Sequence, residues 1–290
     1  MRWTTGSRGS INDMRGASGG GRGMIPLGIG GFIVVALLSM FTGVDFFDIL
    51  GGGGGSSQPT AVGTSGTVTG SPTEEKMVDM VDAVATDVQQ TWTQALGGRY
   101  QQTKVTLFRD SIQSGCGYAG AVSGPFYCPR DRQVYLDLSF FDELQRRFGA
   151  SGDFAQAYVL AHEFGHHVQS LTGTESSVRE AQQANPSNGN ALSVRLELQA
   201  DCYAGVWGHE AAKPGRAAKG QVELDPGDLE EALRAAAAIG DDRLQKLGSG
   251  RVMPEKFTHG SSEQRQTWFK RGFDSGDPRQ CDTFGNSGTR

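Results

Sequence analysis

The chain has 290 residues, 43 of them glycine, and a formal net charge of −5. This length allows one or two domains, and the glycines gather in the first seventy residues, so we expect the packed part to follow Ser71. The charge divides into +3 for residues 1–23 and −8 for the remainder. Because an acidic body gives no electrostatic support for binding nucleic acid, we expect no nucleic-acid partner.

The first seventy residues predict three segments. Residues 1–23 hold four arginines among Gly and Ser and too little apolar content to fold alone, which predicts a flexible basic tail. Residues 24–44 run for 21 positions without a charge, enough for a helix that spans a bilayer. A cleaved signal peptide is the alternative, although the run is long for one and Ser39-Met40-Phe41 is a poor cleavage site. Residues 45–70 are mainly Gly, Ser and Thr, a flexible linker.

The charges on either side of residues 24–44 predict an orientation. Arginines precede the apolar run, whereas Asp45 and Asp48 follow it. The positive-inside rule then places the tail in the cytoplasm and residues 71–290 outside it.

Residues 71–290 predict a mostly helical α+β domain with a small sheet. A helix begins at Ser71, with Pro72 and Glu74 as favourable first residues, and ends near Gly97. Strands are expected at residues 104–108, 117–123 and 133–138. Further helices are expected at residues 140–148, 153–172, 191–207 and 225–239, with Asp225 as the cap of the last and a polar loop over residues 172–190.

An H-E-x-x-H sequence, His162-Glu163-Phe164-Gly165-His166, lies inside the helix expected from Asp153, its cap, to Gly173, its stop. Histidines four residues apart share one helical face, so both imidazoles can reach one metal ion, and Glu163 can lie beside a metal-bound water. This layout is typical of zinc peptidases. A degenerate sequence that had lost its metal would show the same pattern.

Glu197 and Asp201 form a second candidate group, on the helix expected at residues 191–207. They are four residues apart and share a face, so one carboxylate could bind the metal while the other orients a histidine ligand through its free ring N–H. Two acids on a solvated helix face are the plainer explanation. Beside an H-E-x-x-H helix we favour the ligand interpretation.

Three other histidines need separate interpretations. His259 lies far from the helices above; it is either a surface or packing residue or a group that acts on the developing oxyanion. His167 is turned about 100° from His166 around the helix, and His209 lies near a helix end, so we expect neither to bind the metal.

The chain has four cysteines and no C-x-x-C spacing. On the outer side of a membrane this favours disulfides over thiolate ligands. Three pairings are possible. We expect the close pair Cys116–Cys128 to staple a hairpin, which leaves Cys202 with Cys281.

Several stretches together resemble the bacterial neutral zinc metallopeptidases. They are Met1-Arg2-Trp3, the Arg/Gly-rich tail, the apolar run into Gly43-Val44-Asp45, residues 124–129, the H-E-F-G-H-H-V-Q run at residues 162–169 and residues 258–273. The resemblance covers nearly the whole chain. The wider group that it resembles is the gluzincins, in which the third zinc ligand is a glutamate from a downstream E-x-x-x-D helix.

This resemblance implies roles for individual residues. His162, His166 and Glu197 would bind one zinc ion per chain. Glu163 would be the general base, and Asp201 would hold a histidine ligand. The T-H-x-x-x-x-x-R stretch is similar to one whose histidine faces the reacting carbonyl in membrane-anchored gluzincins, which supports His259.

The resemblance also implies a fold and a function. We expect a zincin-like domain that is anchored in the bacterial inner membrane by residues 24–44, with a cytoplasmic N-terminus and a periplasmic catalytic part. It would hydrolyse peptides or unfolded proteins, which would dock as an added strand at the sheet edge. Two alternatives stay open: a binding or scaffolding module that keeps zinc for folding only, and a zinc amidase that acts on cell-wall peptides.

Overall fold

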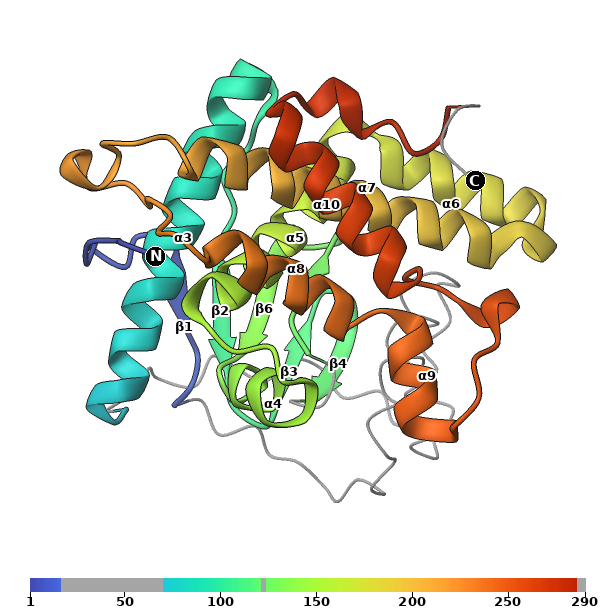
Figure 1. The fold of residues 1–290 in the computed structure, drawn as a ribbon, viewed down its shortest axis with the longest axis horizontal. Helices are drawn as coiled ribbons and strands as arrows, with labels where there is room; N and C mark the ends of the chain where they lie inside the picture. The colour runs from blue at the N-terminus through green and yellow to red at the C-terminus, as the bar shows by residue number, and fades with distance from the viewer. Residues whose placement is uncertain (17–69, 121–123, 286–290) are drawn as a thin grey trace, which may run out of the picture.

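A small sheet lies beneath a group of helices in the computed structural model, which describes residues 1–16, 70–120 and 124–285 (Figure 1). The helices are α3 (Pro72–Leu96), α4 (Ser139–Phe148), α5 (Asp153–Thr172), α6 (Thr174–Ala184), α7 (Gly189–Ala211), α8 (Asp228–Ala238), α9 (Asp241–Ser249) and α10 (Ser262–Ser275). The strands are β1 (Ile11–Asp13), β2 (Val105–Phe108), β3 (Ser111–Ser114), β4 (Gly117–Gly120), β5 (Phe126–Cys128) and β6 (Gln133–Asp137). The predicted α+β class, mostly helical with a small sheet, is confirmed.

The main sheet has the strand order β1-β2-β6-β5. Strands β1, β2 and β6 are parallel, with Val105 paired to Ile11 on one side and Val134 on the other, whereas β5 runs antiparallel to β6. Strands β3 and β4 form a separate antiparallel hairpin. Strand β5 is therefore an edge strand, and it contacts α5, the helix that carries the H-E-x-x-H sequence.

Helix α3 follows the sequence prediction closely. The Ser71 hydroxyl accepts a hydrogen bond from the Glu74 N–H, Pro72 is the first helical residue, and Gly97 ends the helix with a φ of 58°. The face of α3 that packs into the core consists of Val78, Val81, Val84, Val88 and Trp92. Figure 1 shows α3 at one flank of the molecule, with α6 and α9 at the other.

Two predicted helix caps, Asp153 and Asp225, are wrong. The structure begins α5 at Asp153, but the Asp153 side chain does not cap the helix, because its carboxylate lies 3.2 Å from the Met1 amino group. Helix α8 begins at Asp228 instead of Asp225, and here the Asp228 carboxylate accepts a hydrogen bond from the Asp225 N–H. The predicted stop of α5 at Gly173 is confirmed, with a φ of 81°.

Residues 172–190 also differ from the prediction of a polar loop. Most of this stretch is helix α6. Its one buried side chain is Val178, so it lacks the apolar periodicity that identifies a core helix from sequence. An ion pair between Glu175 and Arg179, one turn apart, helps to stabilise the exposed side of α6.

Residues 1–16 belong to the folded unit, which corrects the prediction of a flexible tail over residues 1–23. Strand β1 pairs with β2, and the Arg2 backbone exchanges two hydrogen bonds with Glu223. Arg15 is only 4% exposed and forms ion pairs with acids of β1 and α3. Three of the arginines that the charge count assigned to a free basic tail, Arg2, Arg8 and Arg15, instead pair with carboxylates of the folded unit.

Residues 1–16 and the H-E-x-x-H helix belong to one folded unit, because β1 pairs with β2 in the sheet that packs against α5. The predicted orientation in a membrane stays a prediction. The predicted span at residues 24–44 and linker at residues 45–70 fall almost wholly outside the described residues. No helix within the described part of the chain is both long and apolar enough to cross a bilayer.

Both predicted disulfides are confirmed. Cys116–Cys128 ties the turn of the β3–β4 hairpin to the end of β5, and Cys202–Cys281 ties α7 to the C-terminal segment. Helices α7 and α10 also cross closely, because a Cβ on Gly205 or Gly272 would overlap the backbone of the opposite helix. This crossing brings the start of α10 onto the part of α7 that carries the predicted acidic group.

Candidate metal centre

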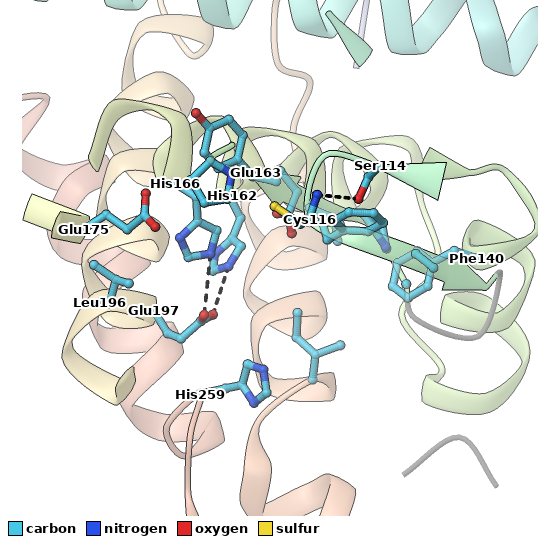
Figure 2. Close-up of a pocket in the computed structure, with 18 of the residues that line it drawn as sticks. Ser114, Cys116, Phe140, His162, Glu163, His166, Glu175, Leu196, Glu197 and His259 are labelled. Atoms are coloured by element: carbon cyan, nitrogen blue, oxygen red, sulfur yellow. Dashed lines mark hydrogen bonds and ion pairs between the residues drawn. The ribbon is translucent and has the colours of Figure 1, made fainter. Parts of the chain in front are cut away.

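The three predicted metal ligands converge at one point. His162 and His166 come from α5 and Glu197 from α7, and one ligand atom from each lies within 4.8 Å of the others. Glu197 Oε2 lies 3.2 Å from His162 Nε2, and Glu197 Oε1 lies 3.6 Å from His166 Nε2. Figure 2 shows both rings pointing at the Glu197 carboxylate.

The opposite nitrogen of each ring is held in place. His162 Nδ1 lies 2.8 Å from Asp201 Oδ1, and His166 Nδ1 lies 2.9 Å from Gln169 Oε1. The amide nitrogen of Gln169 in turn donates to the Leu196 carbonyl on α7 at 2.7 Å. Each imidazole therefore turns Nε2 toward the centre. Metal-binding histidines are commonly held in this way, by a partner on the other ring nitrogen.

The close packing of α5 against α7 depends on the glycine of the H-E-x-x-H sequence. A Cβ on Gly165 would lie 3.0 Å from both the Cα and the carbonyl oxygen of Ala200. Ala200 sits between Glu197 and Asp201 on α7. Gly165 thus allows α7 to approach close enough for its carboxylates to meet the histidines.

Sequence reasoning missed two side chains that complete this network. Arg265, on α10, donates from Nε to Asp201 Oδ2 at 2.8 Å and from Nη2 to Asp201 Oδ1 at 2.9 Å. The Tyr158 hydroxyl donates to Asp201 Oδ1 at 2.5 Å. Tyr158 precedes His162 by one turn, and the spacing alone marks it as a core residue. Arg265 is the arginine of the T-H-x-x-x-x-x-R stretch, and this stretch is the only feature of the sequence that points to it.

Burial and charge shape the protonation of this centre. Burial disfavours the charged form of His162, but Asp201 and Glu197 outweigh it and raise the pKa of the ring to about 9. Burial lowers the pKa of His166 to about 4. Burial would raise the pKa of Asp201, but Arg265 and His162 lower it on balance. The His162 ring lies between the two carboxylates, with Asp201 at Nδ1 and Glu197 at Nε2.

Glu163 lies in the same cleft, on the helix turn between the two histidines. Its side chain is 8% exposed, and burial raises the pKa of its carboxyl to about 7. His162 and a backbone hydrogen bond from Tyr127 on β5 oppose this rise. A carboxyl group with a pKa near neutrality can both accept and return a proton at physiological pH.

His259 lines the cleft beside the centre, as Figure 2 shows, below the Glu197 carboxylate. A third residue that sequence reasoning missed, Asp241, holds it in place. Asp241 Oδ1 lies 3.1 Å from His259 Nδ1, and Asp241 Oδ2 accepts hydrogen bonds from the backbone N–H groups of Thr258, His259 and Gly260. The histidine is thereby fixed both by its ring and by its backbone.

The other two histidines lie away from the metal centre. His167 is fully buried, and its ring contacts the Tyr127 hydroxyl and the Gln101 carbonyl, which ties α5 to β5 and to the loop before β2. The His209 ring lies 2.7 Å from the Phe273 carbonyl on α10. Both side chains therefore serve the packing of helices.

A cavity of about 200 Å³ opens beside the centre, with two unlike walls. The apolar wall comes from α4, α5, the end of α8 and α9, and it consists of Phe140, Phe148, Val159, Ile239 and Leu244. The polar wall comes from α6 and consists of Glu175, Arg179 and Gln182. The β3–β4 hairpin and the edge strand β5 complete the lining.

Comparison with known proteins agrees with this geometry. The model of the family described as "Putative neutral zinc metallopeptidase" matches residues 1–284. The chain belongs to this family. The "Uncharacterized protein YpfJ" of Escherichia coli K12 is 49% identical over 99% of this chain and 100% of its own length. The "Uncharacterized protein Mb2605" of Mycobacterium bovis is 46% identical over 70% of this chain and 69% of its own length. No solved structure matches the chain.

The donor atoms suit the metal that this zinc metallopeptidase family implies. Two imidazole nitrogens and one carboxylate are the ligands of many catalytic zinc sites, which keep a further position open. Both rings present Nε2, because Asp201 and Gln169 hold Nδ1. The residues present therefore fit a zinc ion.

Proposed function

We propose that this protein is a zinc-dependent endopeptidase in which His162, His166 and Glu197 hold the metal. The observation that carries the proposal is the convergence of these three side chains, with both rings fixed from behind. Zinc in such a site lowers the pKa of water toward ~7 and polarises a carbonyl group.

The side chains around the metal would divide the remaining work. Glu163 would take the proton of the attacking water and pass it to the leaving amine, a task suited to a buried carboxyl with a pKa of about 7. His259, held by Asp241, would stabilise the negative charge that develops on the carbonyl oxygen. Asp201 and Arg265 would keep the His162 ring in its ligand orientation.

Strand β5 is the edge at which a peptide would add as a further strand. Its residues Phe126 and Tyr127 line the cleft, and no described strand pairs with the outer side of β5. A peptide held there would run past Glu163 with its backbone groups paired. The apolar wall would take a bulky apolar side chain of that peptide.

We also propose that the folded unit lies outside the cytoplasm. The two disulfides support this, because such bonds persist in oxidising compartments. Labelling of free thiols in intact cells, with and without reduction, tests it: cysteines that are already reduced in the cell would contradict an extracytoplasmic location. Attachment through residues 24–44 stays a prediction from the sequence.

The test of the peptidase function is metal analysis together with a proteolysis assay on the purified full chain. We expect one zinc ion per chain and cleavage of an unfolded protein by the wild type. Glu163→Gln should keep the zinc and lose turnover, whereas His162→Ala should lose both. Full activity in Glu163→Gln would refute Glu163 as the base. A zinc-loaded wild type that cleaves neither unfolded proteins nor cell-wall peptides would point to a binding or scaffolding module.

A further inference from the structure

Two arginines line the cleft within the described part of the chain, Arg179 and Arg265. Arg265 is 2% exposed, and its Nε and Nη2 atoms are bonded to Asp201. The Arg179 side chain is 35% exposed. Arg179 is therefore the guanidinium group that a ligand in the cleft can reach.

Arg179 has hydrogen-bond donors to spare. Its Nη2 atom donates to Glu175 Oε1 one turn earlier on α6, and this is its one hydrogen bond to the described residues. A guanidinium carries five N–H donors in a planar fork, which matches the two oxygens of a carboxylate. Glu175 is less exposed, at 17%, so it anchors the guanidinium from behind and leaves the outer edge open.

Gln182 extends this polar wall by a further turn of α6. Its amide nitrogen donates to the Gly189 carbonyl and the Ser193 hydroxyl, but its Oε1 atom is buried and has no partner among the described residues. A buried acceptor without a donor is costly. The protein encloses this oxygen, so a ligand in the cleft cannot reach it, and Arg179 is the side chain of this wall that has open donors.

The position of Arg179 relates it to the metal centre. Glu175 and Arg179 line the same cleft as His166, and the Arg179 guanidinium bonds to the Glu175 carboxylate. A group on a peptide bound in this cleft could therefore reach the guanidinium.

We propose that Arg179 binds a carboxylate of the peptide substrate and so makes α6 a specificity-determining wall of the cleft. The carboxylate comes either from an acidic side chain or from a free C-terminus. This inference rests on the proposed peptidase function. It adds a preference for substrates with a carboxylate near the cleaved bond, which the zinc ligands and Glu163 do not determine.

The test compares matched peptides that share one cleavable sequence. One series carries Glu, Gln or Lys at each of four positions on either side of the bond, all with amidated C-termini, and a second compares free with amidated C-termini. Wild type, Arg179→Ala and Arg179→Glu are assayed for KM and kcat. Arg146→Ala is the control, because Arg146 also pairs with an acid one turn earlier, Asp142, but does not line the cleft.

We expect the wild type to favour a carboxylate over its amide at one position by about five- to tenfold, mainly in KM. Arg179→Ala should lose this preference, Arg179→Glu should favour Lys there, and Arg146→Ala should keep the wild-type pattern. The Glu series and the C-terminus series distinguish the two sources of the carboxylate. A preference that survives in Arg179→Ala, or none in the wild type, would overturn the inference.

A binding arm separates this inference from the peptidase proposal. The affinity of the same peptides is measured on Glu163→Gln, alone and combined with Arg179→Ala. If the wild type cleaves nothing but the Glu163→Gln protein prefers carboxylate peptides through Arg179, the peptidase proposal fails and the binding site stands. If the wild type cleaves and neither assay finds a preference, the carboxylate site alone fails.

Discussion

Arg265 binds Asp201 with two parallel hydrogen bonds, of 2.8 and 2.9 Å. The same Asp201 carboxylate holds the Nδ1 atom of His162 at 2.8 Å. Asp201 is fully buried, and Arg265 nearly so. Helix α10 thus contacts the predicted metal ligand His162 through a chain of two charged side chains, Arg265 and Asp201.

Replacing Arg265 should therefore weaken metal binding from a distance. Arg265→Lys keeps the charge but not the two parallel bonds, and we expect zinc affinity to fall by about tenfold or more. Competition with a zinc chelator measures this. Arg271→Lys on the same helix, whose guanidinium stacks over Trp268, is the control and should keep wild-type affinity. Unchanged affinity in Arg265→Lys would mean that Asp201 orients His162 unaided.

Gly165 offers a test of the helix packing. Gly165→Ala places a Cβ 3.0 Å from Ala200 and should push α7 away from α5, lowering zinc affinity and the midpoint of thermal unfolding. We expect a loss of about 1–3 kcal/mol in the free energy of unfolding. Gly248→Ala, at a helical glycine with open space around it, should be neutral or stabilising. Equal behaviour of the two variants would contradict the close contact.

Asp241 should act through His259. Asp241→Asn puts an amide where the ring meets a carboxylate, so the ring loses its charged partner. We expect kcat to fall by about tenfold or more with zinc content unchanged, as for His259→Ala. In the double variant the two losses should not add, because both remove the same group. Additive losses would show that Asp241 serves the fold by a separate route.

The two disulfides should contribute unequally to stability. The closed loops differ in sequence separation, 12 against 79 residues. Chain entropy then predicts a loss of about 3 kcal/mol for Cys116→Ser/Cys128→Ser and about 4.5 kcal/mol for Cys202→Ser/Cys281→Ser. Urea unfolding checks the order. Cys116 also lines the cleft, so the first pair should alter KM as well; unchanged KM would place the hairpin outside the substrate path.

Acid should release the first strand before the rest of the fold. Arg8 and Arg15 hold the pKa of Glu75 below its ordinary 4.5, and Arg15 lowers that of Asp13 against the opposing effect of burial. Groups with a lowered pKa in the folded state stabilise it above their ordinary pKa, and the gain is lost as the pH falls through the folded value. Protection of β1 amides from hydrogen exchange should therefore drop below about pH 4 while α5 stays protected. Parallel loss in β1 and α5 would contradict this.

The features that could be predicted from sequence are those with local causes. Ser71 caps α3 by its own hydroxyl, Gly173 ends α5 through its own backbone, and the spacing of His162 and His166 is a property of one helix. Even the third ligand, Glu197, could be proposed from a spacing of four on a second helix.

The features that could not be predicted depend on distant partners. Asp241, at the start of α9, contacts His259, which lies in the segment that joins α9 to α10. Arg265 contacts Asp201 because Gly205 and Gly272 let α7 and α10 cross closely. Strand β1 is three residues long and pairs with a strand more than ninety residues later. No local pattern in the sequence encodes such contacts.

Arg15 and Gly70 both contact the Glu75 carboxylate, so the described residues on either side of 17–69 meet at the first turn of α3. One carboxylate thus fastens the N-terminal segment to the unit that carries the cleft, and its removal should loosen both of these contacts at once.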